Sequence, residues 1–86
     1  MKVPWNIHSV TLSATKHFAI DYMRPWSWDF NDLREAIARA YKITKEGKEK
    51  YEIYVQKRGY KKIIAAYYDT EKQLLCITGS QGGKRT

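Results

Sequence analysis

The sequence KYEIYVQK at residues 50–57 is followed by Arg58-Gly59 and then by YKKIIAAYY at residues 60–68. Both segments are rich in β-branched and aromatic residues, which is typical of strands. A two-residue connection that contains glycine has the length of a tight hairpin loop, because glycine takes positive φ without strain. This stretch therefore predicts a β-hairpin. Its pairs run outward from the turn as Val55 with Lys62, Ile53 with Ile64, and Tyr51 with Ala66.

A second turn at residues 69–72 continues the meander into a third strand. The predicted pairs are Tyr68 with Gln73, Ala66 with Leu75, and Ile64 with Ile77. Because successive side chains on a strand point to opposite faces, this register assigns every residue to one face. The face predicted to form the core collects Tyr51, Ile53, Val55, Ile64, Ala66, Leu75 and Ile77. The opposite face collects Lys50, Glu52, Tyr54, Gln56, Lys61, Tyr67, Thr78 and Ser80, together with Ile63, Ala65, Leu74 and Cys76. An apolar middle with basic margins indicates a shallow binding surface or a patch that a partner covers.

The first half of the chain predicts one short strand and two helices. Residues 10–12 favour a strand, and residues 14–23 favour a helix that Ser13 or Thr15 caps and that Arg24-Pro25 ends. A second helix begins at a cap provided by Asp29 or Ser27. Its apolar stripe consists of Phe30, Leu33, Ile37, Ala40 and Tyr41, and its opposite, polar face consists of Asn31, Arg34, Glu35, Arg39 and Lys42. Tyr41 and Tyr51 are both expected in the core. We therefore predict an α+β fold in which two N-terminal helices pack on one face of an antiparallel sheet of three to four strands.

Composition places the chain among single soluble domains. It has 86 residues, 43% of them hydrophobic, and a mean hydropathy of -0.66. We expect one domain over residues 1–80 and a flexible basic tail at residues 81–86. The lone Cys76 is expected to be a small buried residue, since it has no second cysteine to pair with. No apolar run is long enough to cross a bilayer and no signal peptide is recognisable, so a cytoplasmic protein with no membrane partner is predicted.

The positive charge is concentrated in the second half of the chain. Residues 1–41 carry five Lys and Arg against four Asp and Glu, whereas residues 42–86 carry eleven against five. A basic sheet with interleaved tyrosines suits a phosphate backbone with stackable bases. The residues predicted to bind nucleic acid are Lys50, Tyr54, Lys57, Tyr67, Lys84 and Arg85. The alternative is a set of solvated lysines around an ordinary sheet.

His17 and Asp21 lie one helical turn apart, so the carboxylate could orient the imidazole for general acid or base chemistry. A surface pair with no catalytic role is the competing interpretation. Two histidines, one cysteine and scattered carboxylates show none of the spacings of a metal site. We therefore predict neither a metal nor a cofactor.

The order of these segments resembles a family of small uncharacterised domains allied to the RelE/ParE and BrnT toxins. The residues that carry the resemblance are His17 at the start of a helix, DFNDLREAI at 29–37, KYEIYV at 50–55, Gly59, IIAAYYD at 63–69 and LCIT at 75–78. It covers roughly residues 8–80. The resemblance implies a RelE-like fold and a metal-independent endoribonuclease toxin that an acidic antitoxin-like protein neutralises over its basic surface.

Metal-free RNA cleavage needs removal of the 2′-hydroxyl proton, cations around the phosphate and a proton for the leaving oxygen. The candidate catalytic residues are His17 for proton transfer, and Arg58 and Lys61 for phosphate contacts. If both helices cover the apolar face, His17 lies away from these cations. Three functions therefore stay open: an endoribonuclease, a non-catalytic module that binds RNA or another nucleic acid, and a protein-interaction domain that uses the open sheet face.

Overall fold

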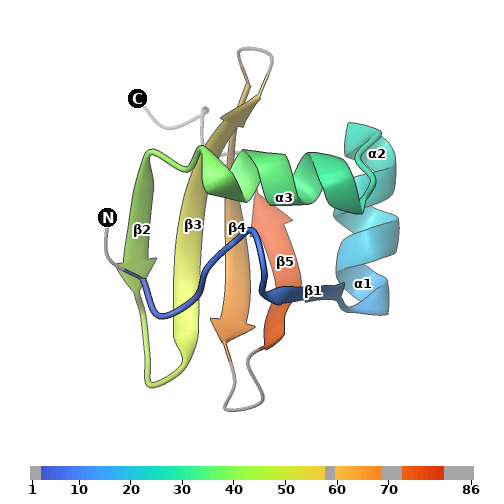
Figure 1. The fold of residues 1–86 in the computed structure, drawn as a ribbon. Coiled ribbons are helices and arrows are strands. Elements are labelled where there is room, and N and C mark those ends of the chain that lie inside the picture. Colours follow the sequence, from blue (N-terminus) through green and yellow to red (C-terminus); the bar gives the residue numbers. More distant parts are fainter. Residues whose placement is uncertain (1–2, 58–59, 69–72, 81–86) are drawn as a thin grey trace.

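The computed structural model describes residues 3–57, 60–68 and 73–80, and its centre is a five-stranded sheet (Figure 1). The strands are β1 (Thr11–Ala14), β2 (Lys42–Lys45), β3 (Lys50–Lys57), β4 (Tyr60–Tyr68) and β5 (Gln73–Ser80), in the order β1-β5-β4-β3-β2. β1 runs parallel to β5, and the other neighbours are antiparallel. The α+β class is confirmed, but the sheet is mixed and wider than the predicted antiparallel sheet of three to four strands.

β2 is the strand that the sequence did not predict. Its four residues include one strongly apolar side chain, Ile43, so they carry too little alternation to indicate a strand. In the structure Ile43 lies opposite Ile53 and packs against the core. Lys42, predicted on the polar face of the second helix, belongs to this strand because the helix ends earlier.

The first helical segment runs without a break through α1 (Lys16–Phe18), η1 (Ala19–Met23) and α2 (Arg24–Trp26). Thr15 caps it, since its hydroxyl accepts a hydrogen bond from the Phe18 amide at 3.1 Å. The predicted end at Arg24-Pro25 is wrong: the helix passes through Pro25 and ends at Ser27, which has a left-handed φ of 61°. Proline removes a backbone donor and crowds the preceding turn, and the π-helical turn η1 just before it accommodates that change.

The second helix, α3 (Phe30–Ala38), begins at the predicted Asp29 cap. Asp29 and Asp32 form a reciprocal capping box, with hydrogen bonds of 2.8 and 3.0 Å between each side chain and the other residue's amide. Leu33 and Ile37 are buried as predicted, but Phe30 is exposed. Arg34 donates from Nη1 to the carbonyl of Val10 at 3.0 Å and also to that of Ile7, so α3 holds the N-terminal segment in place.

The β3–β4 register is confirmed at each of the three predicted pairs. The predicted β4–β5 register is wrong by one residue: Tyr68 pairs with Leu74, and Ala66 pairs with Cys76. A one-residue slip exchanges the faces of a strand, so Leu74 and Cys76 are fully buried in the core and Leu75 shares the opposite face with Tyr67. Beyond this point the register shifts again at a bulge between Ala65 and Ala66, where β5 carries one extra residue.

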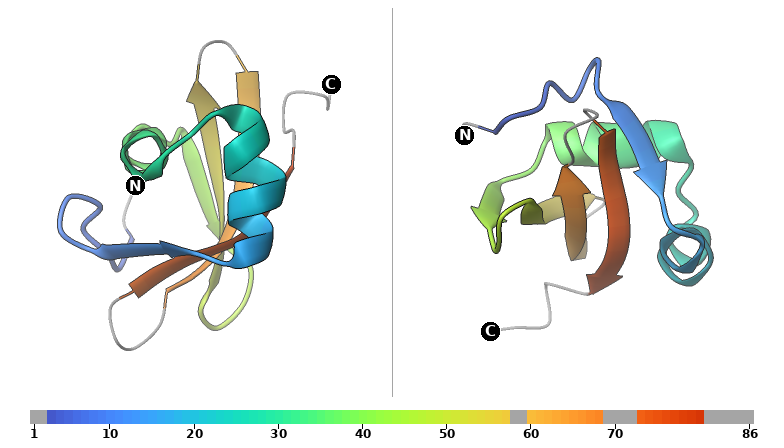
Figure 2. Two further views of the ribbon diagram at one scale, coloured as in Figure 1. Left: turned by 90° about the vertical axis from the view of Figure 1, so that its right-hand side faces the viewer. Right: turned by 90° about the horizontal axis from the view of Figure 1, so that it is seen from below.

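Among the described residues, no helix crosses the sheet face opposite α3 (Figures 1 and 2). α3 and the N-terminal segment cross one face, where Trp5 packs edge-on against Tyr51 at 5.0 Å between ring centres. The first helical segment does not cross that face as α3 does: it lies along β5 beyond the end of β1, where Thr15 donates to the Ile77 carbonyl, and its end reaches the covered face, where Trp26 lies over Lys62. β1 pairs with only the first half of β5, and this helix covers the edge that β1 leaves unpaired. We call the sheet side opposite α3 the open face.

Within the described residues, no helix is both long enough and apolar enough to span a bilayer.

Candidate nucleic-acid interface on the open sheet face

The strand register arranges much of the open face in three rows, because residues that pair directly across strands project on the same side. The rows consist of Lys42, Tyr54, Ile63 and Ser80; Thr44, Glu52, Ala65 and Thr78; and Lys50, Tyr67 and Leu75. Successive rows are two residues apart along a strand, or roughly 7 Å. Each outer row therefore presents one lysine and one tyrosine, and the middle row presents a carboxylate between two small side chains.

The first row extends into a cluster that we call the Tyr–Lys cluster, formed by Tyr41, Lys42, Tyr54 and Lys61. Lys42 Nζ lies 5.0 Å from the centre of the Tyr54 ring, and Lys61 Nζ lies 5.6 Å from the centre of the Tyr41 ring. The two rings are 6.2 Å apart. The prediction that Tyr41 belongs to the core is wrong, since it is 49% exposed: α3 ends at Ala38, and Tyr41 leaves the helical stripe before the chain enters β2.

Glu52 contacts the Tyr–Lys cluster through Tyr54, whose hydroxyl donates to Oε1 of Glu52 at 3.1 Å. The hydrogen bond to this carboxylate, together with desolvation and the carboxylate charge, raises the pKa of Tyr54. Across the strands Glu52 faces Thr44 and Ala65. Thr44 directs its hydroxyl at Glu46, to which it donates at 2.7 Å. Within the described part of the chain, no lysine or arginine forms an ion pair with Glu52.

Four of the residues predicted to bind nucleic acid or phosphate share the open face: Lys50, Tyr54, Lys61 and Tyr67. Lys50 lies directly opposite Tyr67, and the tyrosine is 42% exposed. The backbone of Lys57 belongs to β3, but its side chain lies outside what the structure describes. The predicted sites at Arg58, Lys84 and Arg85 also lie outside the described residues.

The predicted His17–Asp21 pair is present, with Nδ1 of the histidine 2.7 Å from Oδ2 of the aspartate. Both side chains are more than half exposed, at 54% and 53%. α1 lies beside β5 at one edge of the sheet, whereas Lys61 reaches from β4 toward Tyr41 near the other edge. The structure therefore does not bring His17 to Lys61.

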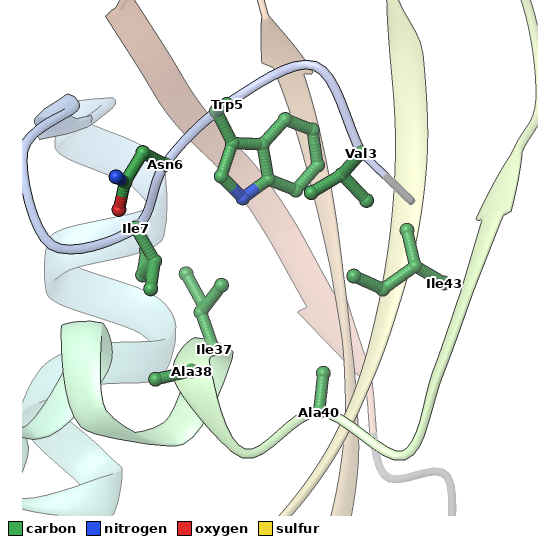
Figure 3. Close-up of a pocket in the computed structure, with 8 residues that line it drawn as sticks. All are labelled: Val3, Trp5, Asn6, Ile7, Ile37, Ala38, Ala40 and Ile43. Atoms are coloured by element: carbon green, nitrogen blue, oxygen red, sulfur yellow. The ribbon is translucent and has the colours of Figure 1, made fainter. Parts of the chain in front are cut away.

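A recess lies on the covered side of the sheet (Figure 3). Its volume is about 560 Å³, and its walls come from the N-terminal segment, the end of α3 and β2. It is lined by Val3, Trp5, Asn6, Ile7, Ile37, Ala38, Ala40 and Ile43. Sequence reasoning missed it because its walls are distant in sequence and one of them is the unpredicted strand.

Comparison with protein-family models found no match to the chain, and searches of curated proteins and of solved structures found none either.

Proposed function

We propose that this protein is an RNA-binding domain of RelE-like architecture that holds nucleic acid on its open face. The observation that carries the proposal is the pairing of lysines with accessible tyrosines on an uncovered sheet: the Tyr–Lys cluster in one part and Lys50 with Tyr67 in another. Lysines neutralise phosphates, and tyrosine rings stack on bases whatever their sequence. The resemblance to RelE-like toxins favours RNA as the polymer and the cytoplasm as its location.

Charge supports the same conclusion. The whole chain carries a net charge of +7. The three rows and the Tyr–Lys cluster place Lys42, Lys50 and Lys61 around the carboxylate of Glu52, and Glu46 adds a second carboxylate beside Thr44. A surface of this kind attracts a polyanion and releases its counterions on binding, so affinity falls steeply as salt rises.

The geometry favours binding of RNA without cleavage of the strand. Cleavage by the predicted set would require His17 to share a phosphate with Lys61. The histidine lies beyond β5 and the lysine points toward β2, so they do not converge on one phosphate. His17 with Asp21 is then a solvent-facing helical pair.

The test is fluorescence anisotropy of a labelled single-stranded RNA, measured over a series of salt concentrations. Lys61→Ala and Lys42→Ala should each weaken binding and lower the slope of log affinity against log salt by about one. Lys16→Ala is the matched control, because Lys16 is exposed on α1 away from the open face. A salt-independent affinity, or an equal effect of the control, would refute the proposal. Gel analysis of the same RNA separates binding from cleavage.

A second candidate function, protein interaction, is favoured by the recess beside β2. β2 is the last strand of the sheet and pairs only with β3 among the described strands. An extended segment of a partner protein can therefore pair with the free edge of β2 and place side chains in the adjacent recess. The acidic antitoxin-like protein implied by the family resemblance is the partner to test. Ala38→Asp should abolish binding of that partner protein while leaving RNA affinity unchanged. If the variant still binds the partner, this recess is not the binding site.

A further inference from the structure

The middle row of the open face contains a feature that phosphate binding does not explain. Glu52 presents a carboxylate among the lysines of a proposed polyanion site, where negative charge opposes phosphate contacts. No basic residue of the described chain forms an ion pair with it. Its hydrogen bond from the Tyr54 hydroxyl uses one acceptor position, whereas a carboxylate offers about four.

The carboxylate of Glu52 is flanked by small side chains across the strands and by two tyrosines. Its cross-strand neighbours, Thr44 and Ala65, are both small. Tyr54 lies two residues along the same strand, and Tyr67 lies in the next row on β4. A base that stacks on either ring would therefore bring its edge toward the carboxylate.

We propose that Glu52 reads the Watson–Crick edge of an unpaired guanine, so that the open face prefers single strands with an accessible guanine. Guanine is the base that presents two adjacent donors, N1–H and the N2 amino group, which two carboxylate oxygens accept together. Cytosine and adenine present an amino group next to a ring nitrogen whose lone pair the carboxylate repels. Uracil presents one N–H between two carbonyls. The edge must be free of its pairing partner, so duplexes are excluded.

This inference rests on the proposed function. Its test uses anisotropy with a labelled twelve-residue uridine oligomer that carries one central guanine. The same oligomer is made with inosine, which lacks the N2 amino group, with 7-deazaguanine, which keeps both donors, and with uridine at that position. Wild-type protein should bind the guanine and 7-deazaguanine oligomers about fivefold or more tightly than the uridine oligomer. The inosine oligomer should fall between them.

Two variants separate base reading from simple charge. Glu52→Gln keeps the size of the side chain but puts a donor where guanine needs an acceptor, so the preference should vanish while affinity for the uridine oligomer is kept or rises. Glu49→Gln removes the same charge from an exposed position in the neighbouring turn and should retain the preference. Circular dichroism checks that both variants are folded.

The outcomes distinguish the two proposals. If the wild type binds none of the oligomers, or binds without salt dependence, the proposed function fails. If it binds with salt dependence but ranks guanine and uridine equally, only the role of Glu52 fails. A uniform gain in affinity for every oligomer in Glu52→Gln would show that the carboxylate merely lowers the positive charge of the face.

Discussion

The ammonium nitrogen of Lys62 lies 4.8 Å from the centre of the Trp26 ring, on the covered side of the sheet. The neighbouring Lys61 projects from the opposite side, toward Tyr41. Lys62 is only 8% exposed, whereas Lys61 is exposed on the open face. Alternation along β4 thus gives two adjacent lysines different roles. Lys61 is available to a ligand, and Lys62 belongs to the packing between the sheet and the end of the first helical segment.

This burial predicts a pH-dependent contribution of Lys62 to stability. Desolvation lowers the pKa of Lys62 from its ordinary value of 10.5. Between the lowered pKa and 10.5 the unfolded chain binds more protons at this site, so the contribution of Lys62 to the free energy of unfolding rises with pH in that window. Urea denaturation should show the wild type gaining stability relative to Lys62→Met as the pH is raised from 7 into that window.

Lys61→Met is the matched control for this experiment, because it removes the same side chain from the exposed side of the same strand. Its free energy of unfolding should stay within about 0.5 kcal/mol of the wild type at both pH values. A difference between the wild type and Lys62→Met that does not change with pH would contradict the burial of the charged group.

Gly79 occupies a position where an added side chain would be tightly packed. A Cβ atom there would lie 3.0 Å from Cη2 of Trp26 and 3.2 Å from the carbonyl oxygen of Ile63. Gly79→Ala should therefore destabilise the protein by about 1–3 kcal/mol, as overpacking does in other cores. In Gly47→Ala the new Cβ would lie 3.7 Å from Cβ of Lys50, an ordinary contact, so its midpoint of thermal unfolding should be close to that of the wild type. Equal effects of the two substitutions would mean that Trp26 does not pack on β5 in this way.

Cys76 should be chemically inert in the folded protein. It is fully buried, and burial raises the pKa of its thiol to about 12. The reactive species is the thiolate, so a thiol reagent at pH 8 should modify the native protein far more slowly than the urea-unfolded chain. Rapid modification under native conditions, at a rate independent of urea, would show that the β1–β5 region is open.

The β3–β4 hairpin could be predicted from sequence because its loop length fixes the register, and the strand residues then fall on consistent faces. Register along β5 was ambiguous, because residues 74–77 are Leu-Leu-Cys-Ile and either alternate pair is apolar enough for the core. Packing decides between them, and it buries Leu74 with Cys76. Hydrophobic periodicity cannot make that choice where four consecutive positions are apolar.

The sequence predicted some members of the open face and missed others. The charge asymmetry and the alternation of β3 and β4 indicated Lys50, Tyr54, Lys61 and Tyr67. Tyr41 and Lys42 were missed, because both were assigned to the second helix and nothing in the local sequence signals that α3 ends at Ala38. Their place beside Tyr54 and Lys61 depends on β2, which forms only through pairing with β3.

Substitution of Tyr67 should separate an effect on RNA binding from an effect on stability. The tyrosine is 42% exposed and lies opposite Lys50, so its removal exposes little core. Tyr67→Ala should weaken single-stranded RNA binding by about 1–3 kcal/mol, the range for loss of one stacked base, with little change in the free energy of unfolding. Anisotropy titration and urea denaturation of the same preparation measure the two quantities.

Phe30→Ala is the control for loss of an exposed ring, because Phe30 is 46% exposed on α3, on the covered side of the sheet. It should leave RNA affinity unchanged. Tyr51→Ala is the opposite control: Tyr51 is 9% exposed and packs against Trp5, so this variant should lose about 3 kcal/mol or more of stability. If Tyr67→Ala binds RNA as well as Phe30→Ala and the wild type do, the Tyr67 ring does not stack on a base. The affinity near Lys50 would then come from phosphate contacts, because these need no aromatic surface.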